Sequence, residues 1–245
     1  MQVAKYNASG NDFVIFHTFK EQNYSELAKK LCHRQKGIGA DGLIVLIPNS
    51  EYDFKWLFYN SDGSDASMCG NGTRACAHYA VANGLANEKM DFLTEAGAIS
   101  SVVDGNIVES ELTKVKELAK SFEEEDREWF FYDTGVPHLV TVVNDLNEYN
   151  KELASKMRYK HNANVNFVLN DKNALHVRTY ERGVEDETGA CGTGMAACFY
   201  ALYQEKKVGD NVIVYPTSKE ELHLRIEGER LFFKGEVTKV FETNI

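Results

Sequence analysis

The chain has 245 residues, of which 43% are hydrophobic and 26% are charged, a composition typical of soluble globular proteins. Its formal net charge of −10 argues against nucleic acid or an anionic membrane surface as the main partner. This length suffices for one large domain or two modest ones.

The first residues, MQVAKYNASGNDFVIF, lack the basic segment and the long apolar run of a signal peptide. The apolar stretch Leu43–Ile47 is too short to cross a bilayer. We therefore expect a cytoplasmic protein with no membrane partner. Cysteines in that compartment are usually thiols, and the absence of any C-x-x-C pair in the sequence argues against a zinc site.

Short strands and two helices are predicted in the first half. The strands are apolar runs bounded by turn residues, at Phe13–His17, Gly42–Ile47 and Phe54–Tyr59. One helix is predicted over Ser25–Arg34. A second, rich in alanine, follows Cys69 and ends at Asn83 and Gly84.

The second half predicts a similar order. It begins with a strand at Leu139–Val143, a helix at Leu146–Met157, strands at 164–169 and 175–180, and a helix from Cys191 to about Lys206. Antiparallel strands follow at 211–217, 222–228 and 230–237, with Gly228 in a hairpin turn. Between the halves, the charge run Glu123–Glu128 predicts a solvated connecting segment and a domain boundary near residues 113–128.

The two halves share one local pattern. Cys69 and Cys191 each precede Gly-x-Gly and are followed seven residues later by a second cysteine, Cys76 or Cys198. Strands align upstream at the same offset. An internal duplication therefore predicts two like lobes, residues 1–113 and 114–235, which places two cysteine-led helix N-termini in one cleft.

Such a pair of helix ends suits acid–base chemistry at one carbon. Glycine lets backbone amides approach a ligand, and the unpaired amides of a helix N-terminus bind a carboxylate and stabilise a thiolate. One thiolate can remove the α-proton of an amino acid from one face while the opposing thiol returns a proton to the other. The duplication is explained because inversion needs one proton carrier for each face, and neither pyridoxal phosphate nor a metal is required.

The remaining three cysteines, Cys32, Cys76 and Cys198, are predicted to be buried core thiols. For Cys69 and Cys191 a redox pair is disfavoured, because such pairs usually have closer spacing in the sequence. The Gly-x-Gly turns are also weak candidates for a dinucleotide loop, which needs a third glycine and a downstream acidic residue.

At these residues the sequence resembles the diaminopimelate epimerase family. The matching blocks follow one order along nearly the whole chain: GNDF (10–13), GIGADG (37–42), NSDGS…CGNGTR (60–74), PH (137–138), NVNF (164–167), ERGVEDET (181–188) and CGTG (191–194). The resemblance implies two similar α+β lobes, each a curled mixed sheet around a central helix, and a homodimer. It also allows residues 236–245 to complete the first lobe.

The resemblance further implies the roles of individual residues. Cys69 and Cys191 would be the base and acid pair in the conversion of LL-diaminopimelate to meso-diaminopimelate. His138 and Glu181 match positions that tune the thiols. The positions matching those that bind the diamino diacid are Asn11, Asn60, Gly70, Asn71, Asn164, Glu181, Arg182, Gly192 and Thr193.

Two departures from the family pattern bear on the substrate. Val136 stands where many members carry asparagine, and Gly42 where some carry glutamine. A racemase of another amino acid, such as histidine, therefore stays open as an alternative. So do a two-lobe binding protein without catalysis and a thiol enzyme that uses Cys69 with His138.

Overall fold

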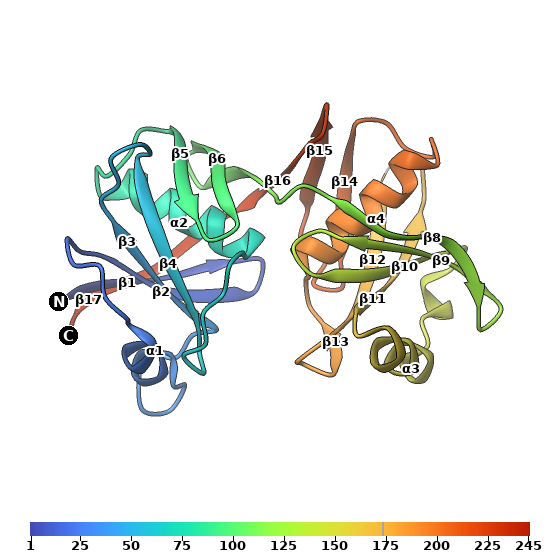
Figure 1. Cartoon of the computed structure of the whole chain (residues 1–245), viewed down its shortest axis with the longest axis horizontal. Coiled ribbons are helices and arrows are strands. Elements are labelled where there is room, and N and C mark those ends of the chain that lie inside the picture. Colours follow the sequence, from blue (N-terminus) through green and yellow to red (C-terminus); the bar gives the residue numbers. More distant parts are fainter. Residues whose placement is uncertain (173) are drawn as a thin grey trace. The chain divides into compact units, whose positions relative to one another are not determined.

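The computed structural model describes residues 1–172 and 174–245, and it divides into two compact units (Figure 1). Unit 1 comprises Met1–Glu111 and Lys234–Ile245, and unit 2 comprises Leu112–Phe233. Each unit combines one mixed sheet with helices, which confirms the α+β class. The sequence placed the boundaries after residues 113 and 235; the structure divides after 111 and 233.

Unit 1 is a single mixed sheet with two helices. Its strands are β1 (Gln2–Ala8), β2 (Asn11–His17), β3 (Gly42–Ile47), β4 (Phe54–Asn60), β5 (Lys89–Thr94), β6 (Gly97–Asp104), β7 (Ile107–Glu111) and β17 (Thr238–Asn244), and its helices are α1 (Ser25–Cys32) and α2 (Gly70–Ala82). The strand order is β17–β1–β2–β3–β4–β5–β6–β7. The β2–β3 and β4–β5 pairs are parallel and the others antiparallel.

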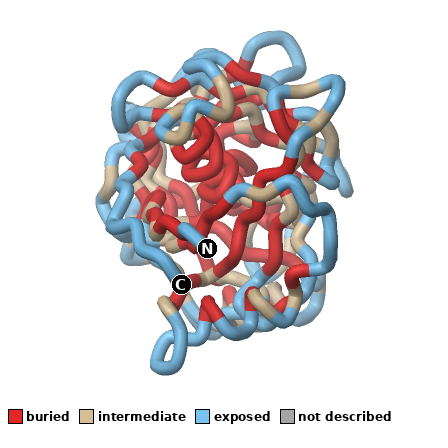
Figure 2. Tube along the Cα trace, turned by 90° about the vertical axis from the view of Figure 1, so that its left-hand side faces the viewer, coloured by how far each residue is buried: buried red, intermediate tan, exposed pale blue. Residues whose placement is uncertain are grey.

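The sheet of unit 1 curls around α2. This helix packs against β1 and β2 near one end of the strand order and against β6 and β7 at the other. Small side chains line it, and Ala75, Cys76 and Ala80 are completely buried against the large rings of Trp56 and Phe92. The burial colouring in Figure 2 shows buried helical turns inside and exposed segments outside. On this face of α2, small side chains let the helix approach the sheet closely.

Unit 2 repeats this plan. Its strands are β8 (Lys116–Glu124), β9 (Arg127–Asp133), β10 (Pro137–Val143), β11 (Asn164–Asn170), β12 (Ala174–Glu181), β13 (Asp186–Thr188), β14 (Asn211–Pro216) and β15 (Leu222–Glu227). Its helical segments are η1 (Leu146–Glu148), α3 (Lys151–His161) and α4 (Gly192–Gln204), and β16 (Arg230–Glu236) runs across the boundary with unit 1. The strand order is β8–β9–β10–β11–β12–β14–β15, with β13 paired to the end of β12.

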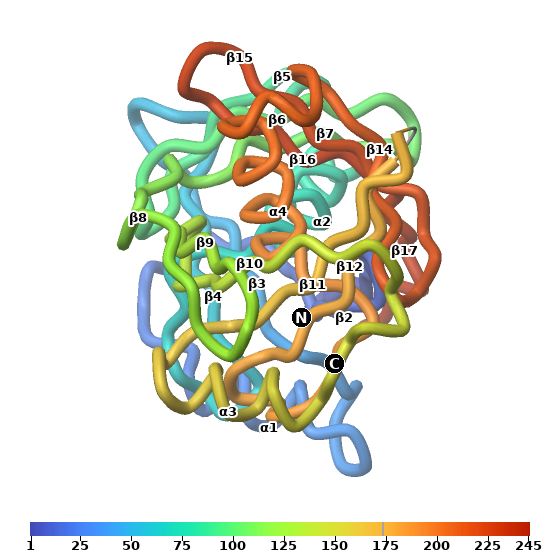
Figure 3. Tube along the Cα trace, turned by 90° about the vertical axis from the view of Figure 1, so that its right-hand side faces the viewer, coloured from blue at the N-terminus to red at the C-terminus, as the bar shows by residue number. Residues whose placement is uncertain are grey.

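The pairing pattern confirms the internal duplication. In unit 1, antiparallel and parallel pairs alternate from β1 to β6, with α1 between β2 and β3 and α2 between β4 and β5. The same alternation runs from β9 to β15 through β10, β11, β12 and β14, with α3 and α4 in the matching places. Helix α4 packs against β9, β10, β11, β12 and β14 (Figure 3), as α2 does within its own sheet.

The charge run Glu123–Glu128 was wrongly predicted to connect the two halves. It forms the tip of the β8–β9 hairpin within unit 2. Glu125 and Asp126 have φ of 52° and 56° and make the two-residue turn. Phe122 opposite Trp129 fixes the register. The sequence hid the strand because β8 is exposed along most of its length, so no apolar alternation marks it.

The helix predicted over Leu146–Met157 is two segments. Asp145 caps η1 in a capping box with Glu148. Asn150 then caps α3, its side-chain oxygen accepting a hydrogen bond from the amide of Leu153 at 3.0 Å. The two N-cap residues, five positions apart, therefore divide the segment that the apolar spacing had predicted as one helix.

The other predicted elements are confirmed, with small changes at their ends. Helix α2 ends with Asn83 as its C-cap, and Gly228, with φ of 62°, lies in the turn between β15 and β16. Strands β1, β5–β9 and β13 were not predicted, and β17 was expected only from the resemblance. Over the ranges 1–172 and 174–245, no helix has both the length and the apolar character needed to cross a membrane.

Gly42 offers a test of how tightly the sheet of unit 1 is packed. A Cβ there would lie 2.5 Å from Cε2 of Phe58 and 2.9 Å from the backbone oxygen of Tyr59. We expect Gly42→Ala to lower the free energy of unfolding by about 1–3 kcal/mol in urea titrations, because a well-packed core resists extra atoms. The control is Gly209→Ala, whose Cβ meets nothing within 4 Å. Equal stabilities of the two variants would contradict tight packing at Gly42.

Candidate active site

Cys69 is the N-cap residue of α2. Its extended backbone, with φ of −155° and ψ of 113°, directs the side chain back toward the first turn. Its Sγ accepts a hydrogen bond from the amide of Gly72 at 3.4 Å. The amides and the partial positive charge of a helix N-terminus favour a thiolate over a thiol. The sequence thus places the sulfur of Cys69 where α2 begins.

Glycine is needed in both cysteine turns because the first helical turn is tightly enclosed. A Cβ on Gly72 would lie 3.3 Å from Cβ of Cys69, and one on Gly194 would lie 2.4 Å from Oδ1 of Asn166. A Cβ on Gly192 would lie 3.1 Å from the ring of Phe233. The two turns therefore use glycine to pack closely against different neighbours.

Asn11 and Asn71, both predicted from the sequence, are hydrogen-bonded to each other. Nδ2 of Asn71 donates to Oδ1 of Asn11 at 2.9 Å, and Nδ2 of Asn11 donates to Asp41 at 2.8 Å. Oδ1 of Asn71 accepts from the buried guanidinium of Arg74 at 2.8 Å. These bonds fix both amide orientations. Sequence reasoning missed Asp41 and Arg74, although both lie inside the family blocks GIGADG and CGNGTR.

Asn60 takes a different environment. It is the last residue of β4, is exposed, and donates from Nδ2 to Oγ of Ser64 at 2.9 Å. Its register partner on β3 is Gly42. Asn60 therefore lies at an open end of the sheet and is not part of the Asn11–Asn71 hydrogen-bond chain that the structure describes.

Cys191 is the corresponding N-cap residue of α4, with φ of −122° and ψ of 104°. Its Sγ lies 3.6 Å from Oγ1 of Thr193, within the range of a hydrogen bond to sulfur. Oγ1 of Thr193 lies 2.9 Å from Nε2 of His138, a residue at the start of β10. Three predicted residues of unit 2, Cys191, Thr193 and His138, thus form one line of hydrogen-bond contacts.

His138 is uncharged in this environment. It is completely buried, and this burial, together with the nearby positive charge of Arg182, lowers the pKa of its imidazole to about 3. A neutral imidazole carries one proton and therefore donates one hydrogen bond and accepts another.

The remaining predicted residues of unit 2 adjoin this line. Oδ1 of Asn164 accepts from the backbone amide of Arg182 at 2.7 Å, and its Nδ2 lies 3.4 Å from Nε2 of His138. Nη1 of Arg182 donates to the backbone oxygen of Asn162 at 3.0 Å. Glu181 is the last residue of β12, half-buried and directly before Arg182. Two residues were absent from the prediction. Nδ2 of Asn166 lies 3.2 Å from Nδ1 of His138, and Oγ1 of Thr179 donates to Oδ1 of Asn166 at 2.9 Å.

The other three cysteines are core thiols, as predicted. Cys76 and Cys198 are completely buried, and burial raises the pKa of both thiols well above the usual range. Burial also raises the pKa of Cys32 to about 12. Only Cys69 and Cys191 lie at helix N-termini.

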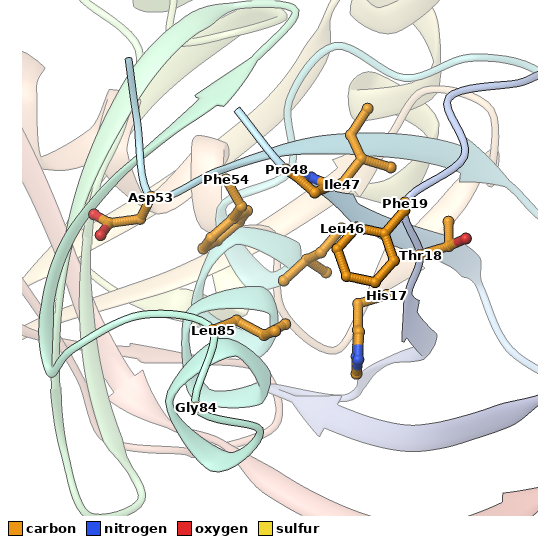
Figure 4. Close-up of a pocket in the computed structure, with 10 residues that line it drawn as sticks. All are labelled: His17, Thr18, Phe19, Leu46, Ile47, Pro48, Asp53, Phe54, Gly84 and Leu85. Atoms are coloured by element: carbon orange, nitrogen blue, oxygen red, sulfur yellow. The ribbon is translucent and has the colours of Figure 1, made fainter. Parts of the chain in front are cut away.

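An apolar pocket of about 290 Å³ in unit 1 does not contain these residues (Figure 4). It is lined by residues at the ends of β2, β3 and β4 and by Gly84 and Leu85, which follow the C-terminal end of α2. Cys69 caps the opposite end of that helix, about 20 Å away at 1.5 Å per residue. In the part of the chain that the structure describes, no cluster of three or more potential metal ligands occurs.

The fold is a duplicated α+β fold, and in this chain a cysteine caps the central helix of each unit. One solved structure of this fold is a phenazine biosynthesis protein of the PhzF family from Bacillus anthracis, with a TM-score of 0.73 and 17% identity, covering 100% of this chain and 98% of that one.

The family itself is given by sequence comparison. The model of the family described as diaminopimelate epimerase matches residues 3–117 and 130–240, and the chain belongs to this family. A diaminopimelate epimerase of a Nitratiruptor species is 60% identical over 244 residues, covering 99% of this chain and 98% of that protein. That of Campylobacter lari is 53% identical over 245 residues, covering 100% and 98%.

The buried neutral His138 predicts a specific pH dependence of stability. Its pKa is about 3 in the folded chain and about 6.5 when unfolded, so between these values only the unfolded state binds the proton. The contribution of His138 to the free energy of unfolding is therefore fully present above pH 6.5 and is lost as the pH drops toward 3. From pH 7 to pH 5 the wild type should lose about 2 kcal/mol more than His138→Gln in urea titrations. Parallel stability curves for the two proteins would show that His138 is charged when folded.

Proposed function

We propose that this protein is a diaminopimelate epimerase that interconverts LL-diaminopimelate and meso-diaminopimelate. One observation carries the proposal: a cysteine caps the central helix of each duplicated unit, in a chain that belongs to this family. Inverting one α-carbon requires a proton carrier on each face. The duplicated fold supplies two carriers of the same kind.

In the proposed mechanism, Cys69 and Cys191 act on opposite faces of the α-carbon. The sulfur facing the α-hydrogen acts as thiolate and takes that proton, and the other sulfur, as thiol, returns a proton to the opposite face. For the reverse direction the two roles exchange. Which sulfur deprotonates which stereoisomer depends on the face of the α-carbon that each sulfur approaches.

The negative charge formed at the α-carbon spreads onto the adjoining carboxylate. We propose that the first-turn residues Gly70 and Asn71, with Gly192 and Thr193, hold this carboxylate. Backbone amides at helix N-termini are suited to that task because their positive ends are fixed before the charge develops. In this mechanism no pyridoxal phosphate or metal takes part.

The distal end of a diamino diacid carries a second ammonium and a second carboxylate. We assign its recognition to Arg182, which can grip a carboxylate through its planar fork, and to Glu181, which can accept from an ammonium. Asn11, Asn60 and Asn164 offer both donors and acceptors to such a zwitterion. His138 and Glu181 are proposed to tune the two thiols.

Val136 is the observation that favours a second substrate. It stands where many family members carry an asparagine, so one polar contact to the substrate is replaced by an apolar side chain. A racemase of another amino acid, histidine among them, is therefore the alternative function. The reaction type is the same in both cases, and the substrate alone distinguishes them.

We further propose that the enzyme works in the cytoplasm as a homodimer. A reducing compartment suits a mechanism in which two reactive thiols must stay unoxidised. The dimer rests on the family resemblance, and exposed apolar residues on β17, Val240 and Phe241, are consistent with a further interface.

The central test follows the α-hydrogen. Incubated in heavy water with LL-diaminopimelate, the wild type should incorporate deuterium at the α-carbon and yield the meso isomer, whereas histidine and glutamate should stay unlabelled. Cys69→Ala and Cys191→Ala should each lower epimerisation by roughly 10²-fold or more, the contribution of one acid–base group. The double variant should be little worse, because the two sulfurs act as a unit.

A β-halogenated analogue separates the two sulfurs. Loss of the α-proton and of halide needs only the base, so Cys69→Ala should process one stereoisomer and Cys191→Ala the other. Cys198→Ala, which lies on the same helix as Cys191 but in the core, is the matched control and should keep normal turnover. The same stereochemical preference in both variants would exclude the two-base mechanism, and labelling of histidine alone would favour the alternative substrate.

The proposed absence of a cofactor has its own test. Dialysis against a metal chelator in the presence of added thiol should leave turnover unchanged, because thiols and backbone amides perform every step. The apoprotein prepared in this way is assayed with and without added zinc. Activity that disappeared on dialysis and returned with the metal would contradict the mechanism.

A further inference from the structure

Asn166 is a completely buried residue of β11 whose amide is hydrogen-bonded on every side. Its Nδ2 donates to the backbone oxygen of Leu139 at 2.8 Å, and its Oδ1 accepts from Oγ1 of Thr179 at 2.9 Å. The reverse amide orientation would place two oxygens together at Leu139. The orientation of this amide is therefore fixed by its partners.

This orientation determines which nitrogen of His138 carries the proton. The second hydrogen of Nδ2 of Asn166 points to Nδ1 of His138 at 3.2 Å, so Nδ1 is the acceptor. The imidazole is neutral and has one proton, which must then be on Nε2. Asn164 offers Nε2 no acceptor, because its oxygen already accepts from the amide of Arg182 and the atom that faces Nε2 is its Nδ2, 3.4 Å away. The partner that can accept from Nε2 is Oγ1 of Thr193, which is closer, at 2.9 Å.

The proton on Nε2 also sets the direction of the next hydrogen bond. Nε2 of His138 donates to Oγ1 of Thr193 at 2.9 Å. The hydroxyl of Thr193 has a single hydrogen, and it is left to donate to Sγ of Cys191, 3.6 Å away. Every bond in the line thus points toward the sulfur. Unit 1 differs here, since Sγ of Cys69 accepts from a backbone amide, that of Gly72.

We propose that Asn166 is a positioning residue that holds His138 in the Nε2–H form, so that the hydroxyl of Thr193 donates a hydrogen bond to Cys191. Gly194 is part of this arrangement, because a Cβ there would lie 2.4 Å from Oδ1 of Asn166 and displace the amide. The inference rests on the proposed function only in treating Cys191 as a proton carrier. A hydrogen bond donated to sulfur stabilises the thiolate, which is the form that takes a proton and the form that reacts with alkylating agents.

The experiment reads the proton on His138 directly, without substrate. Nitrogen-15 NMR of the labelled wild type at pH 7.5 should show the Nε2–H tautomer for His138. Asn166→Ala removes the donor to Nδ1 and should give a mixture of the two tautomers. The matched control is Asn164→Ala, on the same strand and also beside His138, which should keep the pure Nε2–H form.

Alkylation of Cys191 reads the far end of the line. Brief treatment with iodoacetamide followed by peptide mapping should show Thr193→Val reacting about 3- to 10-fold more slowly at Cys191, with Cys69 unchanged, because one donor to the thiolate is lost. Thr193→Ser keeps the hydroxyl and should restore the rate. These variants keep the inference testable if Asn166→Ala does not fold.

Three results would overturn the inference: an Nδ1–H or doubly protonated His138 in the wild type, a pure Nε2–H form in Asn166→Ala, or normal alkylation in Thr193→Val. Its failure is distinguishable from failure of the proposed function. A protein with the expected tautomer and Thr193-dependent alkylation that exchanges no α-proton would uphold this inference and contradict the epimerase. The opposite pair of results would contradict this inference alone.

Discussion

Each unit depends on a central helix that a curled sheet encloses. Ala75, Cys76 and Ala80 in α2, and Ala197 and Cys198 in α4, are completely buried, so neither helix could carry larger residues there without opening its sheet. Enclosure fixes the helix axis and leaves its first-turn amides at a defined place. Those amides need partners, because no residue earlier in the helix can accept from them. Cys69 is thus held beside the donor amide of Gly72, and Cys191 takes the same N-cap position beside the hydroxyl of Thr193.

In the two units, different residues hold the turn that follows the N-cap cysteine. The residue after Cys-Gly is Asn71 in one unit and Thr193 in the other. Asn71 is held from the side by Asn11, whose amide is held in turn by Asp41. Thr193 is held by His138. The duplication therefore preserved the helix, its cysteine and its glycines, while the side chains that support each turn diverged.

The sequence predicted the features that repeat. The duplication, the cysteine-capped helices and the burial of Cys76 and Cys198 followed from one spacing that occurs twice, and the α+β class followed from the family resemblance. It did not predict β8, because a strand exposed along most of its length has no apolar alternation, nor the break at Asn150, because an N-cap can stop a helix within an amphipathic pattern. Asn166 and Thr179 were missed for another reason: their importance lies in hydrogen-bond direction, which has no sequence signal.

The charge state of His138 suits the proposed role of Cys191, in which the sulfur must both take and return protons. A full positive charge beside Cys191 would hold the sulfur as thiolate, and a permanent thiolate cannot return a proton. Burial and the charge of Arg182 keep the imidazole neutral, so it contributes only the direction of a hydrogen bond. A neutral hydrogen-bond donor stabilises a thiolate by less than a cation does. In the two-base mechanism each sulfur needs both forms in every cycle, so weak stabilisation by amides and one hydroxyl serves it better than a strong ion pair.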